Sequence, residues 1–324
     1  MTVGAVLYSQ LFVTPKYPTA SFKDQTIIVT GSNVGLGFEA ARHFVRLYAE
    51  KVILAVRNIA AGEKAKQSIE ESTGRSNVCE VWELDLSSYA SVKAFAERAY
   101  KLDRIDVLLE NAGINSTDFS LAEGHERTIT VNVISTFLLG LLLLPKLRAT
   151  KNQGFNAWPH WSIVTSEVHA FTNLPEWKCP STFEALSDEK QANMRARYVT
   201  SKLLEILVVR EIAPKLAQSG VILNMLNPGF CQSQLIRDER RDWWLVRFLM
   251  LVLARTVEVG ARTLVAAAAA GHESYGAYMT DGKVNNGALS PFVTSPEGKK
   301  AQEKVWSELK EILVNIDPEI AKQL

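Results

Sequence analysis

The stretch TIIVTGSNVGLG, residues 26–37, decides the fold. It starts with an apolar, β-forming run and passes into three glycines, and the amphipathic segment FEAARHFVRLYA follows directly. Gly31 permits a tight turn, Gly35 lets the backbone approach a pyrophosphate, and Gly37 lets the helix lie close to the strand. The amide groups at the start of that helix would point at the phosphates. A plain glycine turn is the competing interpretation, but the flanking strand and helix favour a dinucleotide site. The residues expected to contact the cofactor here are Gly31, Ser32, Asn33, Gly35, Leu36 and Gly37.

Apolar, β-rich runs alternate with helical segments along most of the chain. The runs lie at 26–31, 51–56, 81–86, 105–113, 160–166, 221–229 and 275–282. Strands that are apolar on both faces and separated by helices are typical of a parallel sheet with helices on both sides. The sequence therefore predicts the α/β class, a doubly wound parallel sheet (Rossmann fold). No repeat or linker divides the chain, so we expect one domain over residues 1–324.

Composition excludes several classes of protein. The 324 residues are 47% hydrophobic and 22% charged with a net charge of +1, which fits a folded core and gives no support to a nucleic-acid partner. Cys79, Cys179 and Cys231 form no CxxC pair and the histidines show no metal spacing, so we expect neither disulfides nor a metal site. His169 is expected to be structural. The N-terminus lacks a secretory signal pattern, and a reducing, cytoplasmic location fits best.

The second apolar run, KVILAVRN, ends at Arg57 and has no acid at its tip. An acid there would bind the 2′-hydroxyl of NAD, whereas a cation suits the 2′-phosphate of NADP. We therefore predict NADP(H); a solvated residue at a helix cap is the competing role for Arg57. Asp85 would accept a hydrogen bond from the adenine amino group or cap the next helix. The residues expected along the adenosine are Asp85, Leu86, Asn111, Ala112 and Gly113, of which Gly113 also fits a simple turn.

Four polar residues form a candidate reactive set. Tyr198 and Lys202 are four residues apart in RYVTSK, which places them on one face of a helix. The ammonium of Lys202, with a positive nicotinamide, would lower the pKa of Tyr198 from its ordinary value of about 10. Asn132 lies in an apolar helical segment, which is costly unless its amide is hydrogen-bonded, and Ser166 follows the fifth apolar run.

Together these motifs resemble the short-chain dehydrogenase/reductase family over about residues 22–285. The resemblance rests on TGSNVGLG, NAG, the VN asparagine, the serine at a strand end, the YxxxK pair and the NPG at 227–229. The segments AVRNIAAGEKA, LDLSSYASVKAFA and TSEVHA are similar to the retinol-dehydrogenase-like branch, which includes fungal members of secondary metabolism.

The resemblance implies a role for each residue of the reactive set. Tyr198 would be the general acid or base, and Lys202 would lower its pKa and bind the nicotinamide ribose. Ser166 would hold the substrate oxygen, and Asn132 would bind a water that relays protons.

The chain also departs from the family pattern. Glu110 stands where the family often has asparagine, which matters little if its side chain points away from the site. Cys231 and Ser233 replace a frequent valine and threonine, so only the backbone at Pro228 and Gly229 is expected to contact the nicotinamide carboxamide.

The sequence thus favours an NADP(H)-dependent oxidoreductase that interconverts a ketone or aldehyde and an alcohol on a bulky apolar substrate, such as a secondary metabolite, lipid, retinoid or steroid-like compound. Two insertions, 171–193 and 230–255, are expected to form the substrate lobe. Their large apolar residues would line a cleft or, equally, cover the sheet or contact a subunit: Trp177, Phe183, Trp243, Trp244, Phe248 and Met250. The alternatives are a non-redox dehydratase, isomerase or cyclase, and a non-catalytic NADP(H)-binding regulatory protein.

Two further expectations concern partners. The apolar faces at 138–144 and 203–209 resemble the four-helix contact between subunits common in this family, so a homodimer is expected. The segments VNVISTFLLGLLLLP, which stops at Pro145, and WWLVRFLMLVLA (243–254) are shorter than the ~20 residues that span a bilayer. The first is expected to be a buried or interface helix, and the second leaves peripheral membrane contact open.

Overall fold

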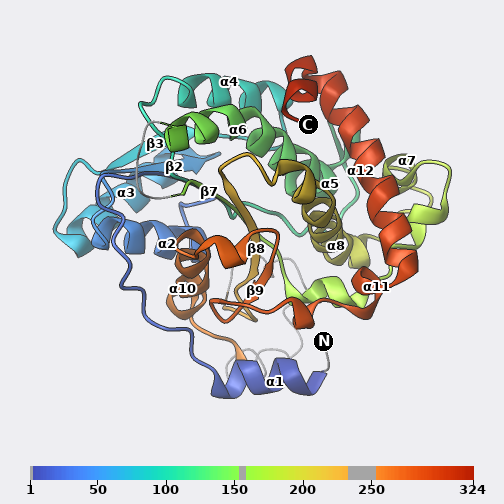
Figure 1. The fold of residues 1–324 in the computed structure, drawn as a ribbon, viewed down its shortest axis with the longest axis horizontal. Helices are drawn as coiled ribbons and strands as arrows, with labels where there is room; N and C mark the ends of the chain where they lie inside the picture. Colours follow the sequence, from blue (N-terminus) through green and yellow to red (C-terminus); the bar gives the residue numbers. More distant parts are fainter. Residues whose placement is uncertain (1–2, 153–157, 233–252) are drawn as a thin grey trace.

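The computed structural model describes residues 3–152, 158–232 and 253–324. Within these residues an eight-stranded sheet has the order β10-β9-β8-β7-β4-β1-β2-β3, and only the β9–β10 pair is antiparallel (Figure 1). The strands are β1 (Thr26–Thr30), β2 (Lys51–Val56), β3 (Cys79–Glu83), β4 (Val107–Glu110), β7 (His160–Val164), β8 (Ile222–Asn227), β9 (Tyr278–Thr280) and β10 (Lys283–Val284). The predicted doubly wound parallel sheet is confirmed.

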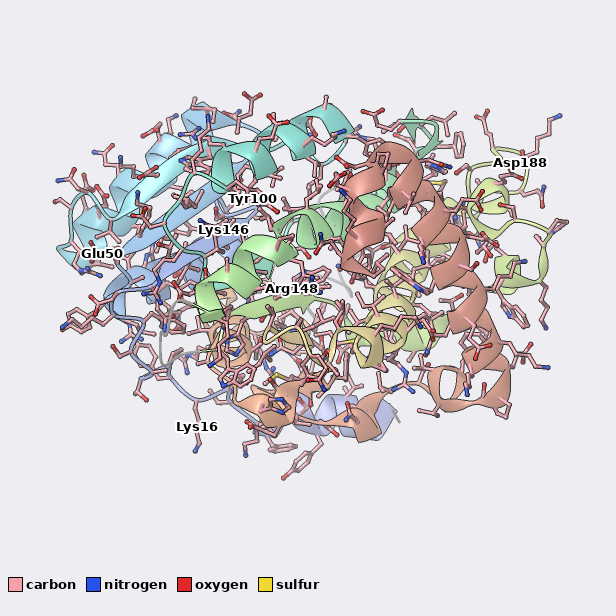
Figure 2. All side chains as sticks on the ribbon, turned by 45° about the horizontal axis from the view of Figure 1, so that its top comes forward. Lys16, Glu50, Tyr100, Lys146, Arg148 and Asp188 are labelled. Atoms are coloured by element: carbon pink, nitrogen blue, oxygen red, sulfur yellow. The ribbon has the colours of Figure 1, made fainter. Side chains whose placement is uncertain are left out.

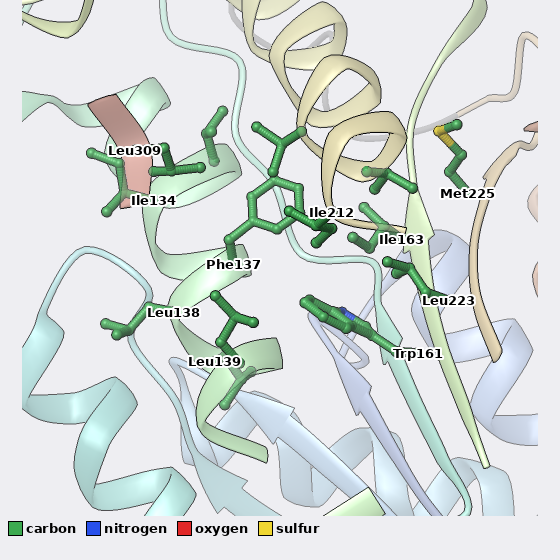
Figure 3. Close-up of a cluster of buried hydrophobic side chains, with 14 of the residues drawn as sticks. Ile134, Phe137, Leu138, Leu139, Trp161, Ile163, Ile212, Leu223, Met225 and Leu309 are labelled. Carbon is green, nitrogen blue, oxygen red and sulfur yellow. The ribbon is translucent and has the colours of Figure 1, made fainter. Parts of the chain in front are cut away.

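Helices cover both faces of the sheet because its strands are apolar on both sides. In β1, Ile27 and Val29 join one buried cluster while Ile28 joins the other, as the alternation of side chains along a strand requires. The first cluster is closed by α2 (Gly35–Arg46), α3 (Ile59–Thr73) and α10 (Val257–Ala268). The second is closed by α4 (Tyr89–Ala99), α6 (Ser135–Asn152) and α8 (Met194–Ile212), and Figure 3 shows part of it around Phe137 and Trp161.

The order of the strands places a crevice at a defined point. β1 has β2 on one side and β4 on the other. From β1 to β3 the strands are added toward one edge of the sheet, and from β4 onward they are added toward the other edge. In an open α/β sheet, ligands bind outside the carboxyl ends of the strands at this switch point. Helix α1 (Val3–Phe12) and the hairpin β5 (Leu121–Ala122) with β6 (His125–Glu126) lie outside the main sheet, and the sequence pattern did not predict them.

Pro145 does not end its helix. It lies inside α6, which continues to Asn152, so the predicted stop is wrong. Proline removes one backbone hydrogen bond, but the burial of Leu144 and Leu147 keeps the helix in place. The continuous helical region Arg127–Lys151, which begins with α5 (Arg127–Ile129), is long and apolar enough to span a membrane. Since 89% of its apolar window is buried in the fold, it is a core helix, as expected.

The C-terminal helix α12 (Pro296–Ile316) covers the outer side of α8 (Figure 1). The 3-10 helix Pro318–Gln323, which follows α12, packs against α6. The apolar side chains at 138–144 and 203–209 are therefore buried within the chain itself, except for the half-buried Leu142. The prediction that these faces meet a second subunit is wrong, because the chain already covers them. A homodimer stays a prediction, and it would need another surface.

The insertion at 171–193 is fastened to α12. Glu308 accepts hydrogen bonds from the amides of Thr182 (2.8 Å) and Phe183 (3.2 Å) at the start of α7 (Thr182–Leu186). Lys304 donates to the carbonyl oxygen of Trp177 at 3.0 Å. Figure 2 shows Asp188, in the same insertion, at the outer edge of the molecule near α12. The short helix α11 (Pro291–Thr294) leads into α12.

Candidate active site

A cavity of about 770 Å³ opens at the carboxyl ends of the central strands. Its wall contains the glycine turn after β1, the residues after β2, β4, β7 and β8, and the first turns of α8. The cofactor turn and the candidate reactive residues therefore share one space, which sequence spacing alone could not establish.

The glycine turn has the backbone that the sequence predicts. Gly31 has φ +65° and Gly35 has φ +64°, in the left-handed region that glycine adopts without strain. A Cβ on Gly31 would lie 2.9 Å from the Cα of Ala112, so the turn also needs a small residue for packing. A Cβ on Gly35 would meet nothing within 4 Å, which leaves the backbone at the start of α2 open to a ligand. These features fit a bound pyrophosphate.

Not every residue of the turn faces the cavity. Asn33 and Leu36 line it together with the two glycines. Ser32 is fully buried, and its hydroxyl donates to the carbonyl oxygen of Val29 at 2.9 Å. Gly37 is also buried, where a Cβ would lie 2.7 Å from the oxygen of Gly31. Ser32 and Gly37 thus shape the turn from behind, and neither residue lines the cavity.

Arg57 lies at the end of β2, exposed on the cavity wall. Asn58 caps α3 by accepting a hydrogen bond from the amide of Ala61 at 2.9 Å, so Arg57 is not the cap. Among the described residues its guanidinium has no hydrogen-bond or ion-pair partner. A free cation at this point fits the 2′-phosphate of NADP.

Asp85 and Leu86 also line the cavity. Asp85 Oδ1 accepts hydrogen bonds from the amide (2.9 Å) and hydroxyl (2.6 Å) of Ser87, whereas the cap of α4 is Ser88. The alternative of a helix cap at Asp85 is therefore wrong. Its carboxylate is held in a local turn with one oxygen engaged by Ser87.

The residues after β4 are tied to β1 across the switch point. Thr30 Oγ1 accepts hydrogen bonds from the amides of Asn111 (3.0 Å) and Ala112 (2.9 Å). The side chain of Asn111 donates to the oxygen of Thr30 at 2.9 Å. Asn111, Ala112 and Gly113 all line the cavity, as do Pro228 and Gly229 after β8.

Tyr198, Lys202 and Ser166 meet at the other end of the cavity. The side chains of Tyr198 and Ser166 are near each other on the cavity wall, and Ser166 acts to lower the pKa of Tyr198. Lys202 Nζ lies 5.7 Å from the centre of the Tyr198 ring and donates to the carbonyl oxygen of Val164 at 2.8 Å. His169 supports this arrangement, because it bonds the oxygen of Ser166 through Nδ1 at 2.7 Å and accepts from the amide of Ser290 at 3.1 Å. Both ring nitrogens are engaged, which fits the structural role expected for His169.

The net shift in the pKa of Tyr198 is upward. Burial is the largest cause, and it outweighs the lowering effects of Lys202 and of Ser166; Glu205 raises the pKa further. Lys202 acts in the predicted direction, but among the residues of the chain it does not dominate. The sequence-based expectation left out both burial and Glu205.

Asn132 lies in a buried helical segment with its amide hydrogen-bonded, as expected. The segment is a π-helical turn, Thr130–Ile134, between α5 and α6, and Asn132 is fully buried behind the cavity wall. Its Oδ1 accepts from the amide of Ile114 at 2.8 Å, and its Nδ2 donates to the oxygen of Ile114 and to Ser201 Oγ, both at 2.9 Å. Both Nδ2 hydrogens are therefore used, so the side chain holds the segment after β4 against α8 and has no donor left for a water.

Sequence reasoning missed the carboxyl group of Glu205. Glu205 Oε1 accepts a hydrogen bond from Lys202 Nζ at 2.8 Å, and a charged residue within the apolar run LLEILVV, three residues after Lys202, was the available signal. The side chain of Glu110 points away from the cavity into the core and accepts from Trp161 Nε1 at 2.6 Å, so this departure from the family pattern does not affect the cavity wall. Two cations, Arg127 and Arg195, also line the cavity and were not predicted.

The predicted apolar cleft residues are only partly described. Phe183 is buried in the core and Trp177 packs against the same cluster, and neither lines the cavity. The prediction of a cleft is wrong for these two, and the alternative of a covering role holds. Trp243, Trp244, Phe248 and Met250 lie outside the described residues, as does most of the segment 243–254, so membrane contact stays a prediction.

Among residues 3–152, 158–232 and 253–324, no group of three or more His, Cys, Asp or Glu side chains could hold a metal ion. The three cysteines are free, and burial raises the pKa of Cys79 and of Cys231 to about 12.

Comparisons with known proteins agree with the fold. The family model described as "short chain dehydrogenase" matches residues 25–155. The chain is 48% identical to the short-chain dehydrogenase anuD of Penicillium roqueforti over 99% of this chain and 85% of that one. It is 46% identical to the short chain dehydrogenase/reductase dmxR8 of a Cryptosporiopsis species over 96% and 97% of the two chains.

Solved structures share the fold at low sequence identity. An NADPH-bound carbonyl reductase from chicken fatty liver has a TM-score of 0.60 at 20% identity, covering 81% of this chain and 99% of that one. The 3-ketoacyl-(acyl-carrier-protein) reductase of Brucella melitensis, in complex with NADH, has a TM-score of 0.59 at 21% identity, covering 80% and 97%. The extent of the similarity to the fungal relatives decides the assignment, and this chain belongs to the short-chain dehydrogenase/reductase family of oxidoreductases.

Proposed function

We propose that the protein is an NADP(H)-dependent oxidoreductase that interconverts a ketone or aldehyde and an alcohol on a bulky, largely apolar substrate. The observation that carries the proposal is that Tyr198, Lys202 and Ser166 line the same cavity as the glycine turn and Arg57. A nicotinamide cofactor, when bound, supplies or accepts the hydride. The residues of the chain position the reactants and handle the proton.

Tyr198 supplies or accepts the proton. Its side chain and that of Ser166 line the same cavity, so a substrate oxygen at this point can contact both hydroxyl groups. Since burial keeps the pKa of Tyr198 above its ordinary value, the phenol is protonated at neutral pH. A protonated phenol can donate to a carbonyl oxygen as the carbonyl carbon is reduced. The environment therefore supports carbonyl reduction as the favoured direction.

Arg57 supports NADP(H) over NAD(H). It is a cation without a partner in the described chain, and it follows β2 at the place where an acid would bind the ribose of NAD. Related structures are known with NADP as well as with NADH. The preference therefore rests on the charge of Arg57 in this chain.

The substrate end of the cavity combines apolar and cationic groups. The apolar part of the wall is formed by Ile114, Val131 and Val199. Arg127 and Arg195 add two guanidinium groups, and the described residues provide no ion-pair partner for either. We therefore propose a substrate with an apolar body and an acidic or oxygen-rich group near the reacting carbonyl. The names of the fungal relatives are compatible with a secondary metabolite.

The test is a cofactor assay with matched variants. Purified protein is mixed with NADPH and a panel of bulky ketones and aldehydes, and the loss of NADPH absorbance is followed. We expect turnover by the wild type and a loss of at least about 100-fold in Tyr198→Phe, because the proton donor is gone. Tyr48→Phe, which changes an exposed tyrosine outside the cavity, should keep full activity. NADPH binding without turnover of any panel member would contradict the redox proposal.

A further inference from the structure

The chain that leaves β8 forms one side of the cavity without being part of a helix or strand. Residues 228–231, which we call the wall segment, all line the cavity. They follow Asn227, the last residue of β8, and only an isolated bridge between Cys231 and Arg255 connects them to another stretch of backbone. Backbone groups in such a segment need other partners, so side chains must fix its conformation.

Helix α1 reaches the wall segment from outside the two helical layers (Figure 1). Its residue Gln10 binds both backbone groups of Phe230, although the two residues are 220 positions apart in the sequence. Gln10 Oε1 accepts from the amide of Phe230 at 3.2 Å, and Nε2 donates to the oxygens of Phe230 at 2.6 Å and of Leu253 at 2.8 Å. A neighbouring strand would offer the same donor and acceptor, so one side-chain amide replaces a strand here.

Arg255 joins α1 to the wall segment a second time. Its side chain is buried, and Nη1 donates to the oxygen of Pro228 at 3.3 Å. Nη2 donates to the oxygens of Ser9 at 3.0 Å and of Val13 at 2.9 Å, at the negative, C-terminal end of α1. Asp281 accepts from the same nitrogen at 2.6 Å and balances the charge. The buried cation therefore has partners on both sides of the contact.

Gly229 shows how closely these side chains enclose the wall segment. Its φ of +80° is in the left-handed region, and a Cβ there would lie 2.8 Å from Arg255 Nη1 and 3.0 Å from Gln10 Oε1. The wall segment thus rests directly on the two side chains. Neither Gln10 nor Arg255 lines the cavity, so they can act on a bound molecule only through the wall segment.

The order of the strands places the wall segment far from Arg57. Three strands, β7, β4 and β1, separate β8 from β2, which Arg57 follows. The neighbour of β8 is β7, which leads to Ser166 of the candidate reactive set. The wall segment is therefore placed for the nicotinamide half of a cofactor and not for the phosphate that Arg57 would bind.

We propose that Gln10 and Arg255 are positioning residues that hold the wall segment in the conformation that receives the nicotinamide half, so that α1 controls cofactor affinity without touching the cofactor. The proposal rests on the nicotinamide cofactor of the function proposed above, but on neither its substrate nor its preference for NADP(H). Coupling between two sites is reciprocal, so a bound cofactor must in turn stabilise the docking of α1.

Gln10→Ala removes the acceptor of the Phe230 amide and should separate the two halves of the cofactor. By titration calorimetry, NADPH and NADH should each bind about fivefold to thirtyfold more weakly, with their ratio unchanged. Adenosine 2′,5′-bisphosphate, which carries the 2′-phosphate but no nicotinamide, should bind as it does to the wild type. Gln67→Ala is the matched control, because it removes the same side chain from the exposed face of α3, where Gln67 donates to Glu71 at 2.8 Å. It should leave all three affinities unchanged.

Hydrogen exchange of the wild type tests the reciprocal effect. NADPH should slow the exchange of the amides of α1 and of Phe230, although no residue of α1 lines the cavity. In Gln10→Ala the protection of α1 should be lost. The measurement needs no turnover, and its first part needs no variant.

Three results would overturn the proposal. One is equal NADPH affinity in the wild type and Gln10→Ala, and another is an equal loss of affinity for adenosine 2′,5′-bisphosphate, which a general loss of stability predicts. The third is exchange in α1 of the wild type that does not respond to NADPH, which counts even if Gln10→Ala fails to fold. NADPH binding without turnover by the wild type would instead contradict the proposed function, and the binding and exchange readouts would still decide the role of α1.

Discussion

At Lys202 a single ammonium group serves both a phenol and a carboxylate. Nζ lies 2.8 Å from Glu205 Oε1 but 5.7 Å from the centre of the Tyr198 ring, so the carboxylate is the closer partner. Burial alone would lower the pKa of Lys202, but Glu205 and Tyr198 more than offset it, and the net shift is upward. Lys202 is therefore charged at neutral pH. A change in the ionisation of Tyr198 near neutral pH is then expected from Glu205, whose pKa is raised to about 7, and not from Lys202.

The raised pKa of Glu205 predicts a specific dependence of stability on pH. Its value of about 7 lies above the ordinary 4.5, so the folded state binds more protons than the unfolded state between these values. The stabilising contribution is complete below about pH 4.5 and is lost as the pH rises through 7. Relative to Glu205→Gln, the free energy of unfolding of the wild type should fall by on the order of 2 kcal/mol across this window. Urea unfolding at several pH values measures it, and a difference independent of pH would contradict the assignment.

Arg57 should determine the choice of cofactor. A charge-assisted bond to the 2′-phosphate is worth about 1.5–3 kcal/mol, so Arg57→Ala should weaken NADPH binding by about tenfold to a hundredfold and leave NADH binding nearly unchanged. Titration calorimetry with both cofactors measures the change. Lys64→Ala removes an exposed cation from α3, outside the cavity, and serves as the control. Equal losses for NADPH and NADH would show that Arg57 does not read the phosphate.

At the scale of the elements, the π-helical turn at Thr130–Ile134 links the segment after β4 to α8 through the side chain of Asn132. Asn132 makes three hydrogen bonds in a fully buried position, to both backbone groups of Ile114 and to Ser201. Asn132→Leu leaves the amide of Ile114 without an acceptor and should lower the free energy of unfolding by about 2–4 kcal/mol. Urea unfolding is the measurement. Stability equal to that of the wild type would mean that this turn does not depend on Asn132.

Local pattern was sufficient for the strands and the cofactor turn, but it did not predict long-range partners. β1 and its turn were predictable because burial on both faces and the need for positive φ leave a signature within a dozen residues. The sites of Trp177 and Phe183 were not, because they depend on Lys304 and Glu308, which lie more than 120 residues away. From the sequence alone, an aromatic residue in an insertion that lines a cleft cannot be distinguished from one that packs under a helix.

In the candidate site, too, local pattern was predictable and long-range packing was not. The spacing of Tyr198 and Lys202 fixed their shared helix face, and Ser166 followed from the end of a strand. The burial of Glu205 could not be deduced, because it depends on the packing of α8 against β8 and α12, which are distant in the sequence. The partner of Glu110, Trp161, could not be deduced either, because a residue at a strand end can face either layer of helices.

Helix α12 contributes its apolar face to the core beside α8. Leu309 is fully buried there, whereas its neighbour Lys310 is exposed. Leu309→Ala should lower the free energy of unfolding by about 2–5 kcal/mol through lost burial and the cavity left behind. Lys310→Ala, one residue away on the same helix, should change it by less than about 0.5 kcal/mol. Thermal or urea unfolding compares the two, and a small effect of Leu309→Ala would show that α12 is only loosely docked.

On the scale of the whole molecule, charge is unevenly distributed although the net charge is only +1. The cavity wall contains Arg57, Arg127, Arg195 and Lys202, against Asp85 and Glu167. Burial raises the pKa of Glu167. A cleft with cationic walls concentrates anions, and this attraction falls as salt screens it. The cavity is thus suited to anionic ligands at both ends, the phosphates of the cofactor at one and an acidic substrate group at the other.

Arg195 tests this view, because it lies on the cavity wall three residues before Tyr198 and has no ion-pair partner among the described residues. We expect Arg195→Gln to raise the KM for a carbonyl substrate that carries a carboxylate by about threefold to tenfold, and to leave the KM of its methyl ester unchanged. Added salt should reduce the difference in the wild type and have little effect in the variant. Lys190→Gln, in the exposed turn before α8 and outside the cavity, is the matched control. If acid and ester respond equally to Arg195→Gln, the guanidinium shapes the wall without selecting charge, and the substrate is then defined by its apolar body alone.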